Sequence, residues 1–255
     1  MSLNLPRPEL TGPDYFDLAA ALAAIEAGRP VRFPPFEVVH WGGLNFCLNF
    51  EKDPIQRCLR RGEFFEEAEL SSLSQYLRPG FHVIDIGSNI GNHALYFAAR
   101  LGAGRVVVIE PNPLALAPLV ANVVINDLGG IIDMGALGIG LSDVSAGGYF
   151  MGRHDRNLGA TRMKPEGGDL QVHPGDDLFE AEAPDLIKID VEGMEMKVLA
   201  GLEQTIARAR PLILIEVDGE NDAAFAEWMA AHRYRVEMTN RHNPKNCNYL
   251  LAPEE

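Results

Sequence analysis

The sequence has few cysteines, and they are far apart. Cys47, Cys58 and Cys247 form no CxxC pair, and an odd number of cysteines is not typical of a disulfide framework. Structural zinc sites use closely spaced cysteine and histidine ligands, a pattern that this sequence lacks. We therefore expect three reduced thiols and no fold that depends on disulfides or zinc.

Positive charge is also scarce. Lys and Arg number 22 against 36 Asp and Glu, which gives a formal net charge of -14. Proteins that follow a phosphate backbone use clustered Lys and Arg, and the one short basic patch here, at residues 57–61, is followed directly by acidic residues. We therefore expect no nucleic-acid partner.

Long apolar runs are absent as well. No segment approaches the roughly 20 apolar residues that span a bilayer, and no N-terminal run has the pattern of a secretory signal. We therefore expect a cytoplasmic protein that has no membrane partner.

What the sequence does contain is a regular alternation of apolar and helical segments that begins at Phe81. Continuous apolar strands that alternate with helices indicate a mainly parallel sheet covered on both faces. We predict an α/β fold with a doubly wound, mainly parallel, seven-stranded sheet of the Rossmann-like kind. The predicted strands are 82–86, 105–110, 131–137, 185–190, 212–217, 234–238 and 248–251, and the predicted helices are 91–100, 112–126, 195–208 and 222–233.

The chain outside this alternation is less regular. Residues 1–62 are predicted to form an N-terminal extension, with a helix at 14–27 and a short hairpin at 37–50. We expect this extension to cover one edge of the ligand-binding cleft of the main domain or to form a homodimer contact. Residues 63–255 then form the main domain, which starts with a helix at 63–77. Residues 142–184, rich in Gly, Asp and Pro, are predicted to be a long loop inserted in it. Pro118 should kink its helix or mark where that helix begins.

A small-residue turn follows the first strand of the predicted sheet. The segment VIDIGSNIGN places Asp85 at the strand end and Gly87 and Gly91 in the turn, where a backbone without Cβ atoms can approach a ligand. Ligands of open α/β sheets bind at this carboxyl edge. Asn89 stands where the dinucleotide fingerprint GxGxxG has its second glycine, which counts against an NAD-dependent oxidoreductase.

Glu110 ends the second strand, about 20 residues beyond the turn, where an acid can accept hydrogen bonds from both hydroxyls of a ribose. In isolation it would be a solvated carboxylate at the end of a strand. Together with the glycine turn, its spacing favours the ribose role.

Acids also follow the fourth strand. Asp190 and Glu192 should lie at the same edge of the sheet, facing the cleft. Lys188 lies within this apolar strand, and a buried lysine needs a partner. An ion pair with a nearby acid is at least as good an interpretation of Lys188 as a catalytic role.

Three segments together resemble the FkbM family of class I S-adenosylmethionine-dependent methyltransferases. They are VIDIGSNIGN, VVVIEPNPLALAPLVANVVIN and LIKIDVEGMEMKVLAGLEQTIARARPLILIEV, of which KIDVEG is the most specific. The resemblance implies a seven-stranded fold, S-adenosylmethionine as methyl donor and transfer to a hydroxyl oxygen of a sugar, natural product or other small molecule. The residues that it assigns to the cofactor are Asp85, Gly87, Ser88, Asn89, Gly91 and Asn92 for the methionine end, Glu110 for the ribose, Pro111, Asn112 and Ser142 for the adenosine, and Asp190.

The acceptor side is less defined by the sequence. Our hypothesis is that Asp190 or Glu192 orients or deprotonates the hydroxyl acceptor, with His154 as a rival base. Acids near neighbouring strand ends also raise the question of Mg²⁺ or Ca²⁺, but their spacing matches no metal motif and we expect no metal. The alternatives are a module that binds S-adenosylmethionine without turnover, and an NAD-dependent oxidoreductase.

Overall fold

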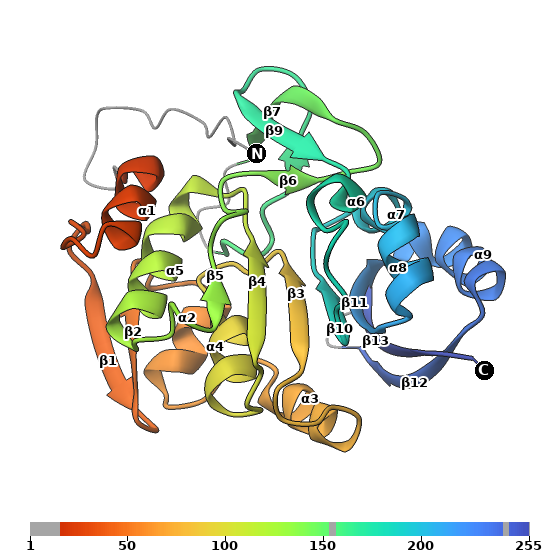
Figure 1. The fold of residues 1–255 in the computed structure, drawn as a ribbon, viewed down its shortest axis with the longest axis horizontal. Helices are drawn as coiled ribbons and strands as arrows, with labels where there is room; N and C mark the ends of the chain where they lie inside the picture. Colours follow the sequence, from red (N-terminus) through yellow and green to blue (C-terminus); the bar gives the residue numbers. More distant parts are fainter. Residues whose placement is uncertain (1–15, 153–156, 242–244, 255) are drawn as a thin grey trace.

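The structure, a computed structural model, describes residues 16–152, 157–241 and 245–254. Its centre is a seven-stranded sheet with the order β12-β13-β11-β10-β3-β4-β5 (Figure 1). The strands are β3 (His82–Ile86), β4 (Arg105–Ile109), β5 (Ile132–Asp133), β10 (Leu186–Ile189), β11 (Leu212–Asp218), β12 (Tyr234–Asn240) and β13 (Asn246–Pro253). Only β13 runs antiparallel to its neighbours, β11 and β12. The predicted seven-stranded, mainly parallel sheet is confirmed.

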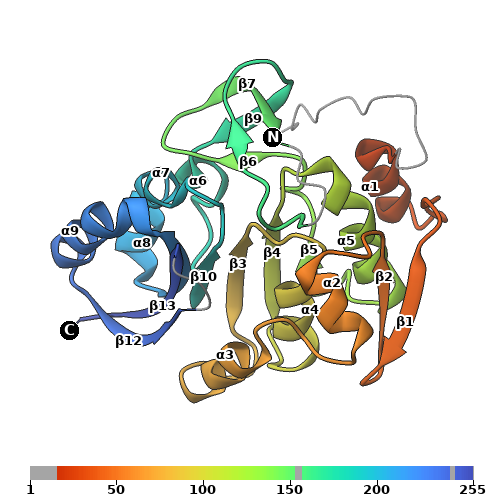
Figure 2. The same ribbon diagram turned by 180° about the vertical axis from the view of Figure 1, so that it is seen from behind.

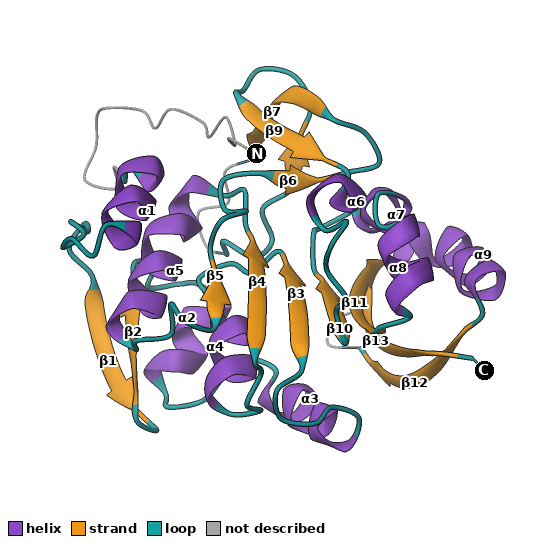
Figure 3. Ribbon diagram, in the orientation of Figure 1, coloured by secondary structure: helices purple, strands orange, loops and turns teal. Residues whose placement is uncertain are grey.

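Helices cover both faces of this sheet, as Figure 3 shows by colour. They are α4 (Asn92–Ala99), α5 (Pro113–Ile125), α6 (Gly175–Leu178), α7 (Glu195–Ala200), α8 (Glu203–Ala209) and α9 (Asp222–His232), with a 3-10 turn η2 (Gly219–Asn221) before α9. Successive residues of a strand point to opposite faces of the sheet, so they belong to two separate hydrophobic cores. Val83 belongs to the core with α4 and α5, whereas Ile84 and Ile86 belong to the core with α7, α8 and α9.

The N-terminal segment packs onto the first of these cores. It comprises α1 (Leu18–Glu26), β1 (Glu37–Trp41), β2 (Leu44–Leu48), α2 (Pro54–Arg60), α3 (Glu67–Ser72) and a 3-10 turn η1 (Leu73–Gln75). The predicted hairpin is β1 and β2, which lies beside α5 in both ribbon views (Figure 2). Asn122 of α5 accepts a hydrogen bond from the backbone N–H of Cys47 at 2.6 Å, and Phe46 is fully buried. The division of the chain after residue 62 stays a prediction.

The segment predicted to be a loop at 142–184 has secondary structure of its own. It contributes β7 (Ala146–Met151), β8 (Met163–Lys164) and β9 (Leu170–His173), which join β6 (Gly140–Leu141) in a four-stranded sheet. This sheet lies over the carboxyl ends of β3 and β4 (Figure 1). The interpretation as a loop was wrong because these strands have only two to six residues, too few for apolar alternation to stand out from the Gly, Asp and Pro around them.

Other boundaries also differ from the prediction. The strand predicted at 131–137 has only two residues, and the helix predicted at 195–208 divides into α7 and α8 at Gly201. A Cβ at Gly201 would collide with the carbonyl oxygen of Ser142, so the glycine permits a close approach between these segments.

Pro118 lies inside α5, which starts at Pro113, so the alternative that the helix begins near Pro118 was wrong. Proline has no N–H to donate to the carbonyl oxygen four residues earlier. The side-chain amide of Asn49 donates to that oxygen, on Leu114, at 2.8 Å. The N-terminal segment therefore supplies a hydrogen bond that the helix cannot make for itself. Among the residues that the structure describes, no helix is both long and apolar enough to cross a bilayer.

Candidate active site

The carboxyl ends of β3, β4 and β10 surround a narrow cavity, called the slot below. Its polar lining includes Gly87, Asn89, Glu110, Asp190 and Glu192. The void measures about 610 Å³, a volume that includes the open solvent at its mouth. The slot lies at the sheet edge where ligands of open α/β folds bind.

Gly87 brings the ends of β3 and β10 together. Its φ is +80°, and a Cβ there would overlap the carbonyl oxygen of Asp190. The sequence led us to expect glycine for the close approach of a ligand, and Gly87 does line the slot. Its missing side chain, however, makes room for a neighbouring strand end, so a larger residue would force the two halves of the sheet edge apart.

Glu110 is held by the backbone of two loops. Its carboxylate accepts hydrogen bonds from the N–H of Asn89 at 2.8 Å and from the N–H of Asn112 at 2.7 Å. Burial raises the pKa of Glu110 to about 7, although both backbone donors lower it. Each oxygen keeps a lone pair for a further donor. Pro111 and Asn112 also line the slot, and the Asn112 side chain caps α5.

Asp85 is fully buried and does not line the slot. The Nζ of Lys188 lies 3.2 Å from its carboxylate and also donates to the carbonyl oxygen of Gly87 at 2.7 Å. Burial lowers the pKa of Lys188, but the charges of Asp85 and Asp190 outweigh it and the pKa is raised. The ion-pair interpretation of Lys188 is confirmed. The proposed contact of Asp85 with a methionine group stays a prediction.

Four other residues that were predicted to bind the cofactor do not line the slot and stabilise nearby loops instead. They are Ser88, Gly91, Asn92 and Ser142. Gly91 begins α4 at a φ of +87°, and the Ser88 hydroxyl donates to the carbonyl oxygen of Asp85 at 2.7 Å. The Asn92 side chain bonds both the N–H and the C=O of Phe65 at 3.1 Å. The Ser142 hydroxyl donates to Asp143 at 2.9 Å.

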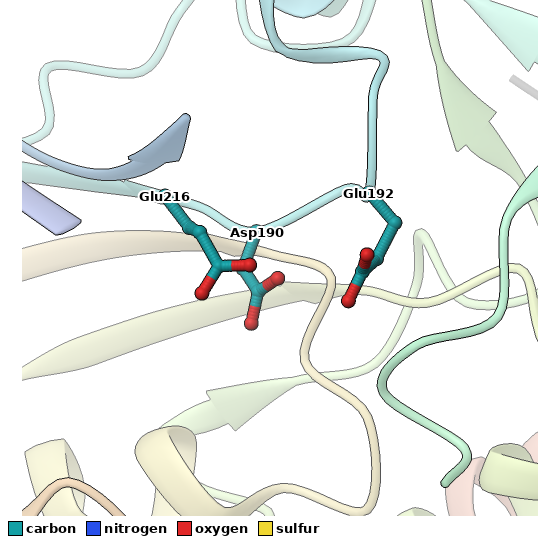
Figure 4. Close-up of side chains that lie close together, drawn as sticks. All are labelled: Asp190, Glu192 and Glu216. Atoms are coloured by element: carbon teal, nitrogen blue, oxygen red, sulfur yellow. The ribbon is translucent and has the colours of Figure 1, made fainter. Parts of the chain in front are cut away.

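Three carboxylates lie close together beside the slot (Figure 4), and two of them, Asp190 and Glu192, line it. Asp190, Glu192 and Glu216, called the carboxylate cluster below, each place an oxygen within 4.8 Å of the others. Burial, then the charges of Asp190 and Asp218, raise the pKa of Glu192 to about 8. Burial, then Asp190 and Glu192, raise that of Glu216 to about 9. These acids therefore hold protons near neutral pH.

Two residues that the sequence did not indicate influence this cluster. A carboxylate oxygen of Glu66 lies 3.3 Å from Nε2 of His93, and both side chains are about nine-tenths buried. Burial raises the pKa of Asp190; the charge of Glu66 raises it too, while His93 lowers it. Glu66 precedes α3 and His93 lies in α4, so only tertiary packing brings them near Asp190. No sequence spacing could have revealed this. The rival base His154 lies outside the described residues.

The remaining lining of the slot is largely apolar. Ile109 comes from β4 of the central sheet and Leu141 from β6 of the four-stranded sheet, whereas Met151, Leu158 and Met163 come from the segment that had been predicted to be a loop. The slot therefore has an acid with hydrogen-bonding capacity, apolar walls suited to a flat ring, and two acids of the carboxylate cluster whose pKa values are raised. Together with the strand order, these features define a class I methyltransferase fold with a nucleoside-type pocket.

Comparison with known proteins identifies the family. Residues 85–250 match the family model described as the methyltransferase FkbM domain. The chain therefore belongs to the FkbM methyltransferase family, as its motifs predicted, and the methyl donor of this family is S-adenosylmethionine. The residues that line the slot fit that cofactor, because they combine an acid that can accept hydrogen bonds from a ribose, Glu110, with apolar walls.

Individual relatives are more distant. The hexuronic acid methyltransferase AglP of Haloferax volcanii is 30% identical over 139 residues, covering 52% of this chain and 54% of AglP. The AMB antimetabolite synthetase AmbE of Pseudomonas aeruginosa is 29% identical over 64% of this chain and 10% of AmbE. The FkbM methyltransferase structure from Methylobacillus flagellatus has a TM-score of 0.50 at 21% identity and covers 68% of this chain and 44% of that one. The chain thus spans a tenth to about half of these relatives.

Proposed function

We propose that this protein is an O-methyltransferase that transfers the methyl group of S-adenosylmethionine to a hydroxyl of a sugar or other small molecule. The observation that carries the proposal is the arrangement of the slot. Glu110 is held in the slot by two backbone N–H groups, and Asp190 and Glu192 of the carboxylate cluster, whose pKa values are raised, line the same slot. The first feature suits a ribose, and the second suits a hydroxyl that must lose a proton.

On the cofactor side, Glu110 accepts hydrogen bonds from the ribose hydroxyls, and Asn112 supports the adenosine. Leu141, Leu158 and Met163 form the walls for the adenine ring, and Asp190 and the turn at Gly87 face the methionine end. When bound, the cofactor supplies a sulfonium-activated methyl group for in-line displacement. The protein's main contribution is then to hold the acceptor oxygen in line with that methyl group.

On the acceptor side, we assign the general base to Glu192. It lines the slot and has a pKa of about 8, close to the operating pH, where a general base is most effective. Asp190 is the alternative base, since it lines the same end of the slot. In both cases the carboxylate takes the hydroxyl proton as the oxygen attacks.

The acids also favour a particular kind of acceptor. A cluster of acids disfavours further negative charge beside it, as the raised pKa values of its own members indicate, so it disfavours an anionic acceptor group and favours a neutral hydroxyl. The name of AglP supports a sugar as the acceptor, in which case a carboxylate on the sugar would have to point away from the cluster. The acidic composition of the chain supports a small molecule over a nucleic acid.

Calorimetric titration with S-adenosylhomocysteine, alongside NAD, tests the proposal. We expect micromolar binding of S-adenosylhomocysteine and none of NAD. Glu110→Ala should weaken binding by about 100-fold, because two hydroxyl bonds to a buried acid are lost. Glu227→Ala, on the exposed side of α9, is the matched control and should bind like the wild type.

The same protein can then be offered hydroxylated acceptors with labelled methyl donor. Binding without transfer to any acceptor would support the alternative of a binding module without turnover. Binding of NAD in place of S-adenosylhomocysteine would refute the proposal and favour an oxidoreductase.

A further inference from the structure

One segment covers the slot and is not part of the central sheet. Residues 157–163, called the covering segment below, contribute Leu158, Gly159, Thr161 and Met163 to the lining. Leu158 is 3% exposed, and the N–H of Thr161 donates to its carbonyl oxygen at 3.2 Å, which closes a turn. The position of this turn therefore sets the width of the slot.

A buried carboxylate from the N-terminal segment holds this turn. Asp53 is fully buried, and its Oδ2 accepts a hydrogen bond from the N–H of Leu158 at 2.8 Å. Its Oδ1 accepts from the N–H of Gln56 at 3.0 Å, which caps α2. One side chain thus caps a helix and ties down the covering segment. An ionised acceptor makes the stronger class of hydrogen bond.

The helix that carries Asp53 is firmly anchored. Gln56 is fully buried, and its side-chain oxygen accepts from the N–H groups of Asn49 and Phe50, both at 2.8 Å. The covering segment also fits closely beside it. A Cβ at Gly159 would lie 3.8 Å from Ile55 of α2 and 3.3 Å from the amide nitrogen of Asn89 in the glycine turn. The covering segment therefore lies between α2 and the turn that lines the slot.

The covering segment has a second tie on its other side. Arg162 pairs with Asp218, at the end of β11, and with Glu220 at 3.1 Å. The Arg162 side chain is 49% exposed, and exposed ion pairs contribute little to stability. The buried Asp53 bond is thus the tie that we expect to matter more.

We propose that Asp53 is a positioning residue for cofactor binding, which holds the covering segment over the slot through the N–H of Leu158. The inference rests on the proposed cofactor site. Asp53 lies in the N-terminal segment, outside the residues that match the family model. Its hydrogen bond to Leu158 therefore connects that segment to the lining of the slot. Because the slot is narrow, a ligand of cofactor size enters and leaves when the covering segment moves, and the Asp53 bond slows that movement.

Asp53→Ser separates the two roles of this side chain. Serine is a good N-cap, so it can still accept from the Gln56 N–H, but its single short oxygen does not reach Leu158. Asp17→Ser is the matched control. Asp17 caps α1 in the same way, accepting from the N–H of Ala20 at 2.9 Å in an exposed position. Asp53→Asn, which keeps the volume and one acceptor oxygen, is a second variant should serine impair folding.

Two measurements on the whole protein test the proposal. In hydrogen–deuterium exchange without ligand, Asp53→Ser should speed exchange of the covering-segment amides about tenfold while α2 exchanges as in the wild type. In stopped-flow binding, S-adenosylhomocysteine should leave about tenfold faster, with the KM for the methyl donor raised and kcat unchanged. Asp17→Ser should change neither, and Asp53→Ser should melt at a lower temperature than Asp17→Ser, because it leaves the buried N–H of Leu158 without an acceptor.

The outcomes are distinguishable. Wild-type binding of S-adenosylhomocysteine, with exchange and dissociation unchanged in Asp53→Ser, overturns this inference alone. A loss of protection that extends through α2 would show that Asp53 is only a helix cap, and would also overturn it. Failure of the wild type itself to bind would overturn the proposed function and this inference with it.

Discussion

Glu110 is a buried acid and the carboxylate cluster is a group of half-buried acids near it, and their surroundings differ in how they affect the pKa. Two backbone N–H groups accompany Glu110, and they lower a pKa that burial raises. In the cluster, acids face one another, and the neighbours of Glu216 that most affect its pKa all raise it. The cofactor side is therefore prepared to accept hydrogen bonds, and the acceptor side is prepared to exchange protons.

The strongest test of this contrast is to neutralise the acids of the acceptor side. We expect Glu192→Gln to lower kcat by roughly 10²–10⁴-fold, the usual contribution of a general base. Binding of S-adenosylhomocysteine should be unchanged, because Glu110 and the apolar walls remain. Single-turnover methyl transfer and calorimetry measure the two effects separately.

Asp190→Asn is the comparison variant for that experiment. If Asp190→Asn loses the rate and Glu192→Gln keeps it, Asp190 is the base. Full turnover in both variants, with normal cofactor binding, would show that neither residue is the base and that the acids only shape the pocket.

The contrast between the two sides also explains how much the sequence revealed. Two short contiguous pieces of the slot, the turn at Gly87–Asn89 and the strand end at Glu110–Asn112, were indicated by their spacing and by the family resemblance, and both line the slot. Their contact with the cofactor stays a prediction. The sequence also predicted an acidic partner for Lys188, because a lysine in an apolar strand needs one, but it did not identify that partner as Asp85. The ends of predicted parallel strands likewise placed Asp190 and Glu192 at one edge of the sheet.

What the sequence missed depends on tertiary packing. Leu158 and Met163 lie in a stretch without apolar alternation, so nothing marked them as part of the slot. Glu66 reaches the cluster from a loop before α3, and Asp53 reaches the slot from α2. Such contacts join residues far apart in the chain, and a single sequence carries no signal for them.

A smaller effect is expected from pH. If Glu192 acts as a base with a pKa of about 8, it is mostly protonated at pH 7 and mostly ionised at pH 9. The rate at saturating cofactor should therefore rise about tenfold between these values and level off above the pKa. A rate that is flat or falls over this range would contradict the assignment, and Glu192→Gln should abolish the rise.

Thermal unfolding provides an independent check on the same titration. The pKa of Glu192 is raised in the folded state above its ordinary value of 4.5, so folding favours the protonated form. The stability that this group contributes is complete below about pH 4.5 and is lost as the pH rises through about 8. Glu192→Gln, which cannot ionise, should consequently melt at a higher temperature than the wild type at pH 9.

The smallest expected effect concerns a metal. Three carboxylate oxygens within 4.8 Å of one another have the chemistry to bind Mg²⁺ or Ca²⁺. Near pH 7, however, the raised pKa values of Glu192 and Glu216 mean that protons already neutralise much of the cluster. We expect EDTA to leave turnover and melting temperature unchanged. Activity that is lost with chelator and restored by Mg²⁺ would assign the cluster to a metal. Each acid of the cluster would then have a fixed partner, as Glu110 has in its two backbone N–H groups. The raised pKa of Glu192 would no longer support its assignment as the general base.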